Sequence, residues 1–181
     1  PFLLLLDHVQ DPQNLGSLLR SAEAAGVHGV VLPGRRAAGV TPAAVRASAG
    51  AAEHVRVAMA GNLVQAMQAL KARNVWLAGL EAHPEARLYT EADLSGPLGL
   101  VVGSEGQGLA RLVRDTCDFL VRLPMYGRVG SLNAGAAGAV ALYEARRQRG
   151  GSTLQAGEIE KSLPEEGPVV GGQGRIRTSE G

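Results

Sequence analysis

The sequence predicts an α/β fold in which helices cover both faces of a parallel sheet. Short apolar runs, typical of buried strands, alternate with segments whose apolar residues recur at helical spacing. Alternation of this kind is typical of parallel sheets that are covered on both faces. The predicted strands are Phe2–Leu6, Gly29–Leu32, Val55–Ala58, Val75–Leu80, Leu98–Val102 and Phe119–Leu123. The predicted helices are Leu15–Ala25, Pro42–Ala49, Leu63–Ala72, Leu109–Thr116 and Asn133–Arg149.

Composition restricts the classes of function. The 181 residues include 45% hydrophobic residues, enough for one domain with a real core, which we place at residues 1–149. A net charge of +1 and only 3% aromatic residues argue against a general basic field and against a base-stacking platform. The single cysteine, Cys117, and the scattered histidines predict no disulfide and no metal site. We expect Cys117 to be a small core residue.

The two ends of the chain differ from the predicted domain. The opening run PFLLLLDHV is too short, and lacks the basic residues, for a signal peptide or a membrane span, so we expect a cytoplasmic protein. Because there is no initiator Met, we also expect that an upstream portion has been removed. Residues 150–181 are rich in Gly, Glu, Pro and Ser, which predicts a disordered tail that need not belong to the natural protein.

Three loops that follow predicted strands carry polar residues, and open α/β sheets place their sites at such loops. In the first, Asn14 stands where the N-cap of a helix is expected. Arg20 can lie back across the bare Gly16 toward Asn14, because helical side chains lean toward the N-terminus. Taken alone, these residues are more simply explained as an ordinary cap and a solvated arginine.

The second loop, GSEGQGL at Gly103–Leu109, follows a predicted strand. Its glycines would let backbone N–H groups approach a ligand at the start of a helix. The glycine spacing is not that of dinucleotide-binding proteins, and no lysine follows as in a P-loop. Glu105 would repel phosphates, so the loop favours a ligand with positive charge or hydroxyl groups. A plain glycine turn explains the pattern equally well.

The third loop leads into the last predicted helix, and Ser131 and Asn133 stand where side-chain oxygens normally cap a helix. That helix begins AGAAGA, and such small residues let another backbone come close. We expect it to pack against a cofactor loop, another part of the chain or a partner subunit. One face of the helix is suited to a homodimer contact, and it consists of Ala136, Ala139, Val140 and Tyr143.

The three loops together resemble the motifs of the SpoU–TrmH branch of the SPOUT RNA methyltransferases. The motifs are Asn14-x-Gly16-xxx-Arg20, Gly103-x-Glu105-Gly106-x-Gly108-Leu109, Leu123-Pro124-Met125 and Ser131-Leu132-Asn133. The similarity extends from about Leu3 to Arg149, and it is greatest to bacterial 23S rRNA guanosine 2′-O-methyltransferases. One departure is the run Ala134–Ala137, where relatives usually carry Ser and Val.

The resemblance implies a fold and its ligands. It implies that the C-terminal part of the sheet is tied in a deep trefoil knot, an exception to the rule of unknotted chains. It implies that S-adenosylmethionine binds there, contacted by the backbone of Gly103, Leu123 and Leu132, with Gly79 and Leu80 as weaker candidates. It further implies a homodimer whose sites draw on both subunits, an RNA substrate, and an RNA-binding domain upstream.

The implied reaction is methyl transfer to a ribose 2′-hydroxyl in structured RNA, first of all a guanosine of 23S rRNA. The implied catalytic residues are Asn14, Arg20, Glu105, Ser131 and Asn133. Arg20 would hold a phosphate or the hydroxyl, and the two asparagines would orient it or the ribose. Glu105 and Ser131 would shape the site. The general base stays open between Arg20, Glu105 and a water molecule.

Three alternatives are compatible with parts of the sequence. The substrate could be tRNA rather than rRNA. A non-catalytic knotted module that binds RNA or assists assembly would be expected to lack Arg20, Glu105 or Asn133, and all three are present. A nucleotide-binding oxidoreductase is disfavoured by the glycine spacing.

Overall fold

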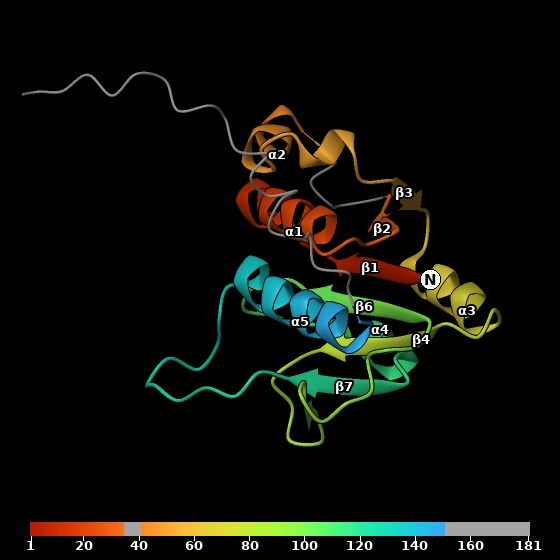
Figure 1. Cartoon of the computed structure of the whole chain (residues 1–181), viewed down its shortest axis with the longest axis vertical. Coiled ribbons are helices and arrows are strands. Elements are labelled where there is room, and N and C mark those ends of the chain that lie inside the picture. Colours follow the sequence, from red (N-terminus) through yellow and green to blue (C-terminus); the bar gives the residue numbers. More distant parts are fainter. Residues whose placement is uncertain (35–40, 151–181) are drawn as a thin grey trace, which may run out of the picture. The chain divides into compact units, whose positions relative to one another are not determined.

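The computed structural model describes residues 1–34 and 41–150, which form a seven-stranded sheet with helices on its faces (Figure 1). The strand order is β3-β2-β1-β6-β4-β7-β5, and every neighbouring pair is parallel. The strands are β1 (Phe2–Asp7), β2 (Gly29–Pro33), β3 (Val57–Ala60), β4 (Trp76–Leu80), β5 (Arg87–Leu88), β6 (Leu98–Gly103) and β7 (Phe119–Arg122). The helices are α1 (Pro12–Ala24), α2 (Pro42–Ala47), α3 (Leu63–Lys71), α4 (Arg111–Thr116) and α5 (Ala134–Gln148), with a 3-10 turn, η1, at Ala51–Glu53.

The predicted α/β class is confirmed, and each predicted strand and helix has a counterpart. The sequence missed β5, which has only two residues and therefore no detectable apolar run. The predicted tail begins at Gly150, and its residues 151–181 lie outside the described residues. Within the described part of the chain, each helix is too short or too polar to cross a membrane.

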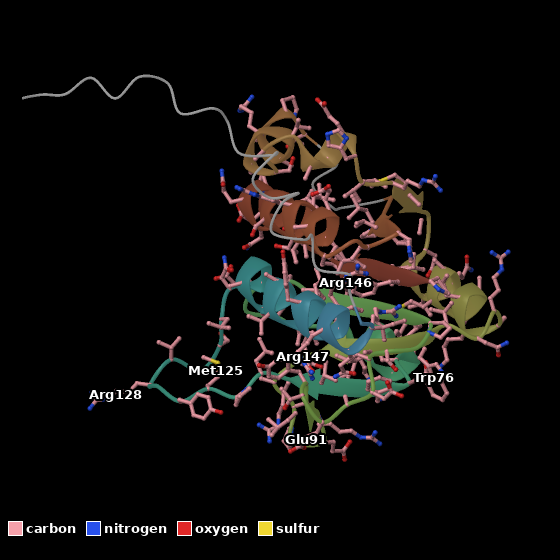
Figure 2. All side chains as sticks on the ribbon, in the orientation of Figure 1. Trp76, Glu91, Met125, Arg128, Arg146 and Arg147 are labelled. Atoms are coloured by element: carbon pink, nitrogen blue, oxygen red, sulfur yellow. The ribbon has the colours of Figure 1, made fainter. Side chains whose placement is uncertain are left out.

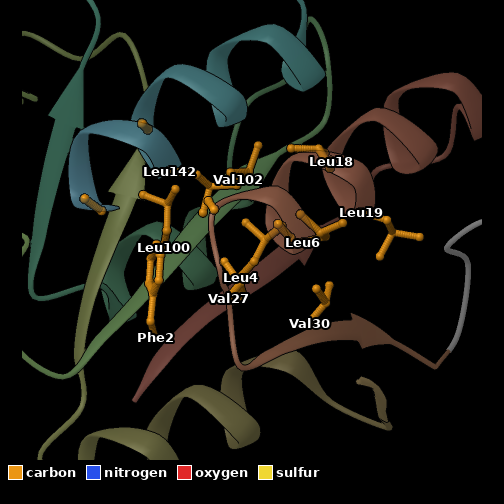
Figure 3. Close-up of a cluster of buried hydrophobic side chains, with 14 of the residues drawn as sticks. Phe2, Leu4, Leu6, Leu18, Leu19, Val27, Val30, Leu100, Val102 and Leu142 are labelled. Atoms are coloured by element: carbon orange, nitrogen blue, oxygen red, sulfur yellow. The ribbon is translucent and has the colours of Figure 1, made fainter. Parts of the chain in front are cut away.

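The core is divided between the two faces of the sheet because side chains alternate along each strand. Leu4 and Leu6 of β1 point to the face covered by α1 and α5 (Figure 3). Leu5, between them, belongs to the opposite cluster, which includes Met67 of α3 and Val113 of α4. The sheet is therefore buried on both sides, as its continuous apolar strands predicted.

Helices α1 and α5 lie side by side because α5 has glycines where they meet (Figure 1). A Cβ on Gly138 would lie 2.3 Å from Cδ2 of Leu18, and one on Gly135 would lie 2.9 Å from Oγ of Ser17. A side chain at either position would require Leu18 or Ser17 to shift. Of the three expected roles for this small-residue helix, close packing on another part of the chain is thus observed.

The predicted position of Arg20 is wrong, because α2 occupies the space beside Gly16. A Cβ on Gly16 would lie 2.4 Å from Cβ of Ala47 and 2.8 Å from the carbonyl oxygen of Ala44. The lack of a side chain at Gly16 therefore allows α2 to pack closely against α1. Arg20 is exposed, and it makes no hydrogen bond with the other described residues.

Candidate active site at the carboxyl ends of the strands

A cavity of about 280 Å³ opens at the carboxyl ends of β4 and β6, beside the start of α5. It brings together residues from the second and third predicted loops. The lining includes all three residues expected to bind a cofactor, Gly103, Leu123 and Leu132, and two of those expected to be catalytic, Glu105 and Ser131. The other lining residues are Leu80, Glu81, Ala82, Val102, Ser104, Gly106, Gln107, Gly108, Met125, Gly130, Ala134 and Ala137.

Gly103 allows the glycine-rich loop to fold back on the end of β6. A Cβ at this position would lie 2.3 Å from the carbonyl carbon and oxygen of Gly108. Ser104 and Gly108 close the loop, because each backbone N–H donates to the other residue's carbonyl, at 3.2 and 2.9 Å. Gly106 and Gly108 have φ angles of 82° and 68°, a conformation that favours glycine. The glycines are thus required by the loop's own backbone.

Asn14 joins the three loops through its side chain. Oδ1 of Asn133 accepts from the backbone N–H of Ala136 at 2.7 Å, so its amide nitrogen is left to donate to Oδ1 of Asn14, also at 2.7 Å. The amide nitrogen of Asn14 then donates to Oε2 of Glu105 at 2.9 Å. The cap of α5 therefore fixes which group donates and which accepts in this series of hydrogen bonds. The series ends at the carboxylate of Glu105.

The expected N-cap role of Asn14 is wrong, whereas that of Asn133 is confirmed. Helix α1 begins three residues earlier than predicted, with Pro12 in its first turn, and Asp11 is the cap. The carboxylate of Asp11 accepts from the backbone N–H of Asn14 at 3.0 Å. The side chain of Asn14 is consequently released from capping. It is buried, with 4% exposure, and bridges the loops instead.

Of the predicted catalytic residues, Glu105 and Ser131 line the cavity, Asn14 and Asn133 are hydrogen-bonded to Glu105 directly or in sequence, and Arg20 does neither within the described part of the chain. It does not belong to the lining, and it is exposed on α1. It lies six positions after Asn14, or about 9 Å along a helix axis. Of the two weaker candidates, Leu80 lines the cavity, whereas the space beside Gly79 is filled by the side chains of Leu109, Cys117 and Leu120.

Two acidic residues near the cavity were missed from the sequence. Asp7, at the end of β1, is 1% exposed, and its carboxylate accepts from the backbone N–H of Ala110 at 2.7 Å, which fixes the far end of the glycine-rich loop. The other oxygen of Asp7 lies 2.5 Å from Nδ1 of His8. A carboxylate that closes an apolar strand was the available signal for Asp7. Glu81 lines the cavity directly after β4.

Cys117 does not line the cavity, and its sulfur lies beside Gly79 of β4. Burial, followed by the nearby charge of Asp118, raises the pKa of the Cys117 thiol from 9.0 to about 12. Its S–H group donates to the carbonyl of Val113 at 3.4 Å. These properties agree with its expected role in the core. Within residues 1–34 and 41–150, no cluster of His, Cys, Asp or Glu is suited to hold a metal ion.

Comparison with known families agrees with this arrangement of loops. Residues 1–143 match the SpoU rRNA Methylase family, which is most of the chain and includes each loop described above. The chain belongs to this family. Membership implies the trefoil knot that the resemblance led us to expect.

Relatives within the family are similar in sequence. The chain is 47% identical over 149 residues to YacO of Bacillus subtilis, a protein provisionally named a TrmH family tRNA/rRNA methyltransferase, and covers 59% of that protein. It is 47% identical over 151 residues to the 23S rRNA (guanosine-2′-O-)-methyltransferase RlmB of Pectobacterium atrosepticum, and covers 62% of it. These matches cover 82% and 83% of this chain. The chain therefore spans about 60% of the length of these relatives.

Solved structures of the family have the same fold. The SpoU methyltransferase AviRb from Streptomyces viridochromogenes, in complex with the cofactor AdoMet, superimposes with a TM-score of 0.75 at 35% identity. The match covers 82% of this chain and 60% of AviRb. The AdoMet-bound rRNA methyltransferase from Sinorhizobium meliloti gives a TM-score of 0.75 at 32% identity, covering 81% of this chain and 56% of the other.

Proposed function

We propose that this chain is the catalytic domain of an enzyme that transfers a methyl group from S-adenosylmethionine to a ribose 2′-hydroxyl of RNA. The observation that carries the proposal is the hydrogen-bonded chain from Asn133 through Asn14 to Glu105, which joins all three family motifs beside one cavity. The SpoU relatives are named as RNA methyltransferases, and two solved relatives hold AdoMet.

The charge of the cavity lining suits the proposed cofactor. The cavity volume of about 280 Å³ is close to the lower end for small-molecule sites. The described residues of the lining include Glu81 and Glu105 but no lysine, arginine or histidine, which suits a cationic ligand better than a phosphate. Gly103, Leu123 and Leu132 would hold the cofactor through their backbones. When bound, the cofactor supplies an electrophilic methyl group on a sulfonium.

The residues of this chain would act mainly by placing the 2′-hydroxyl in line with that methyl group. Positioning of this kind can supply up to about 7–11 kcal/mol of the barrier reduction. Asn14 and Asn133 would orient the ribose or keep Glu105 in place, because their amides are fixed in one direction by the cap of α5. Glu105 and Ser131 line the cavity and would contact polar groups of the substrate or cofactor.

Arg20 would complete the site by reaching across a homodimer. Arg20 is exposed and lies outside the cavity of its own chain. In a homodimer it would reach the cavity of the partner subunit. The proposed dimer surface is the apolar face of α5 formed by Ala136, Ala139, Val140 and Tyr143. Val140 and Tyr143 are 41% and 54% exposed. At the dimer, the guanidinium of Arg20 would hold a phosphate or the hydroxyl through its fork of donors.

The loop between β7 and α5 offers further apolar surface to a partner subunit or to RNA. Met125 and Arg128 lie on this loop, which extends away from the sheet (Figure 2). Tyr126 is 94% exposed and Val129 is 68% exposed. Exposed large apolar side chains on one segment are typical of an interaction surface.

The proposed substrate is a guanosine of 23S rRNA, and tRNA is the second candidate. The first choice rests on the RlmB relatives, and the second on relatives whose names include both RNAs. Mapping 2′-O-methyl groups in rRNA and tRNA from cells with and without the gene tests both. We expect one site to lose its methyl group on deletion and to regain it when the gene is restored. An unchanged set of 2′-O-methyl groups in both RNAs would refute the proposal.

A further inference from the structure

Glu81 stands out among the cavity residues because its carboxylate is poorly compensated. Its backbone is fixed directly after β4, where its N–H donates to the carbonyl of Val121 at 3.0 Å and its own carbonyl accepts from His83 at 3.0 Å. Its Oε1 lies 3.5 Å from Nη1 of Arg114, the outer limit of a hydrogen bond. Its Oε2 is enclosed and has no hydrogen-bond partner in the described part of the chain.

An unpartnered carboxylate oxygen in a protein wall is costly, so a native structure that keeps one calls for an explanation. The ion pair with Arg114 does not compensate this oxygen, because it involves Oε1 and not Oε2. The contact is also long, and Arg114 is one-third exposed. Glu81 keeps 15% of its side chain exposed while lining the cavity. A turn about its soft terminal torsion would bring the unpartnered oxygen toward a ligand.

Gly108 places Glu81 close to the glycine-rich loop. A Cβ on Gly108 would lie 2.8 Å from Oε1 of Glu81, so the bare glycine leaves room for the carboxylate. Glu81 therefore sits where the end of β4 meets that loop, both of which line the cavity. Among the described residues of the lining there is no lysine, arginine or histidine, so the long ion pair with Arg114, which lies outside the lining, is the contact with which a ligand would compete for this carboxylate.

We propose that Glu81 is the anionic contact for a positively charged group of the bound cofactor. The inference rests on the proposed function, which makes S-adenosylmethionine the ligand. That cofactor carries its positive charge on the sulfonium and on the α-ammonium, and both are complementary to a carboxylate in this cavity wall. The contact would give Glu81 the partner that it lacks within the chain.

Calorimetric titration with three ligands tests the contact. S-adenosylmethionine has both cationic groups, S-adenosylhomocysteine keeps only the ammonium, and 5′-methylthioadenosine has neither. Glu81→Gln should weaken S-adenosylmethionine binding about tenfold or more, as expected for a hydrogen bond to a charged group. Binding of 5′-methylthioadenosine should not change. An equal loss for S-adenosylhomocysteine assigns the contact to the ammonium, and a loss confined to S-adenosylmethionine assigns it to the sulfonium.

Two further variants separate this role from a structural one. Glu85→Gln removes an exposed carboxylate from the same loop, outside the cavity lining, and should leave all three affinities unchanged. Arg114→Gln removes the same ion pair but keeps the Glu81 carboxylate, so it should retain S-adenosylmethionine binding. If Glu81→Gln does not fold, Glu81→Asp keeps the charge on a shorter side chain and should still weaken the cationic ligands selectively.

The inference is overturned if Glu81→Gln binds S-adenosylmethionine as tightly as the unmodified protein. It is also overturned if 5′-methylthioadenosine loses as much affinity, or if Arg114→Gln causes the same loss. Failure of the unmodified protein to bind any of the three ligands would instead refute the proposed cofactor, and this inference with it.

Discussion

The side-chain amide of Asn14 donates to the carboxylate of Glu105 at 2.9 Å, although the two residues are 91 positions apart in the chain. Asn14 can make this contact because Asp11 has taken over the cap of α1. Oδ1 of Asn14 accepts from the amide nitrogen of Asn133, so the amide nitrogen of Asn14 is the group that donates to Glu105. This one side chain therefore couples the start of α1, the glycine-rich loop and the start of α5.

Reversing this hydrogen bond is the first test of that coupling. Asn14→Asp should place two carboxylates together and cost about 1–3 kcal/mol of the free energy of unfolding. Adding Glu105→Gln restores a donor and an acceptor in the opposite order, so the double variant should recover most of the loss. Gln13→Glu puts the same charge on an exposed neighbour and serves as the control. Denaturant unfolding measures the free energy of unfolding of the two single variants, the double variant and the control. If the loss in the double variant equals the sum of the losses in the two single variants, the coupling is contradicted.

The close approach of the Gly108 carbonyl to Gly103 leads to a second prediction. Gly103→Ala would bring a methyl group to 2.3 Å from the Gly108 carbonyl, so the loop must move. We expect a loss of about 1–3 kcal/mol in the free energy of unfolding, together with weaker S-adenosylhomocysteine binding. Gly127→Ala is the matched control, since nothing lies within 4 Å of its Cβ position. Equal stability and affinity in the two variants would show that the loop does not need this glycine.

The raised pKa of Cys117 predicts a dependence of stability on pH. The folded thiol has a pKa of about 12 and the ordinary value is 9.0, so the unfolded chain loses its proton first as the pH rises. The stabilisation is complete below pH 9 and falls by about 1.4 kcal/mol per pH unit above it. Unfolding titrations from pH 8 to 10 measure this, with Cys117→Val as the control. An identical slope in both proteins would remove Cys117 as the cause.

The proposed dimer is tested on the face of α5. Ala139 is half-buried between the exposed Ala136, Val140 and Tyr143. Ala139→Arg should turn the dimer into a monomer, because a buried unpaired charge would be forced into the contact. Gln68→Arg adds the same charge to an exposed position on α3 and should leave the assembly intact. Light scattering measures the mass of the assembly in each protein. If the unmodified protein is a monomer at micromolar concentration, the proposed dimer is refuted.

Much of the fold could be predicted because its determinants are local. The continuous apolar run of β6, for example, requires burial on both faces and indicates a parallel sheet. The start of α1 was predicted wrongly because two good caps, Asp11 and Asn14, lie three residues apart, and local preference favours both. Pro12 at the first turn was the neglected signal.

The site was predictable only where motif residues face one cavity. The sequence located Gly103, Leu123 and Leu132, which line it. It did not locate Glu81, because an isolated glutamate after a strand carries no pattern, and its place in the cavity wall beside Gly108 depends on a tertiary contact. The contact of Gly16 with α2 likewise depends on a tertiary approach that helical spacing does not reveal.

Arg20 provides the test of catalysis that is least affected by binding. Arg20→Ala should abolish most methyl transfer while S-adenosylhomocysteine binding persists, because Arg20 does not line the cofactor cavity. Arg20→Lys should recover little, since a point charge does not replace the planar fork. The control is Arg73→Ala, which removes an exposed arginine three residues before β4 that does not line the cavity. Unimpaired transfer by Arg20→Ala would remove Arg20 from the mechanism.

The most direct test of the central claim is to locate the methyl group that the protein transfers. The product of the whole gene is incubated with methyl-labelled S-adenosylmethionine and either rRNA or tRNA from cells that lack the gene, and the RNA is digested to nucleosides. Our account predicts that the label appears in a 2′-O-methylated nucleoside, and that 23S rRNA is the better substrate. Label on a base, or no label in either RNA from a protein that binds the cofactor, would contradict it.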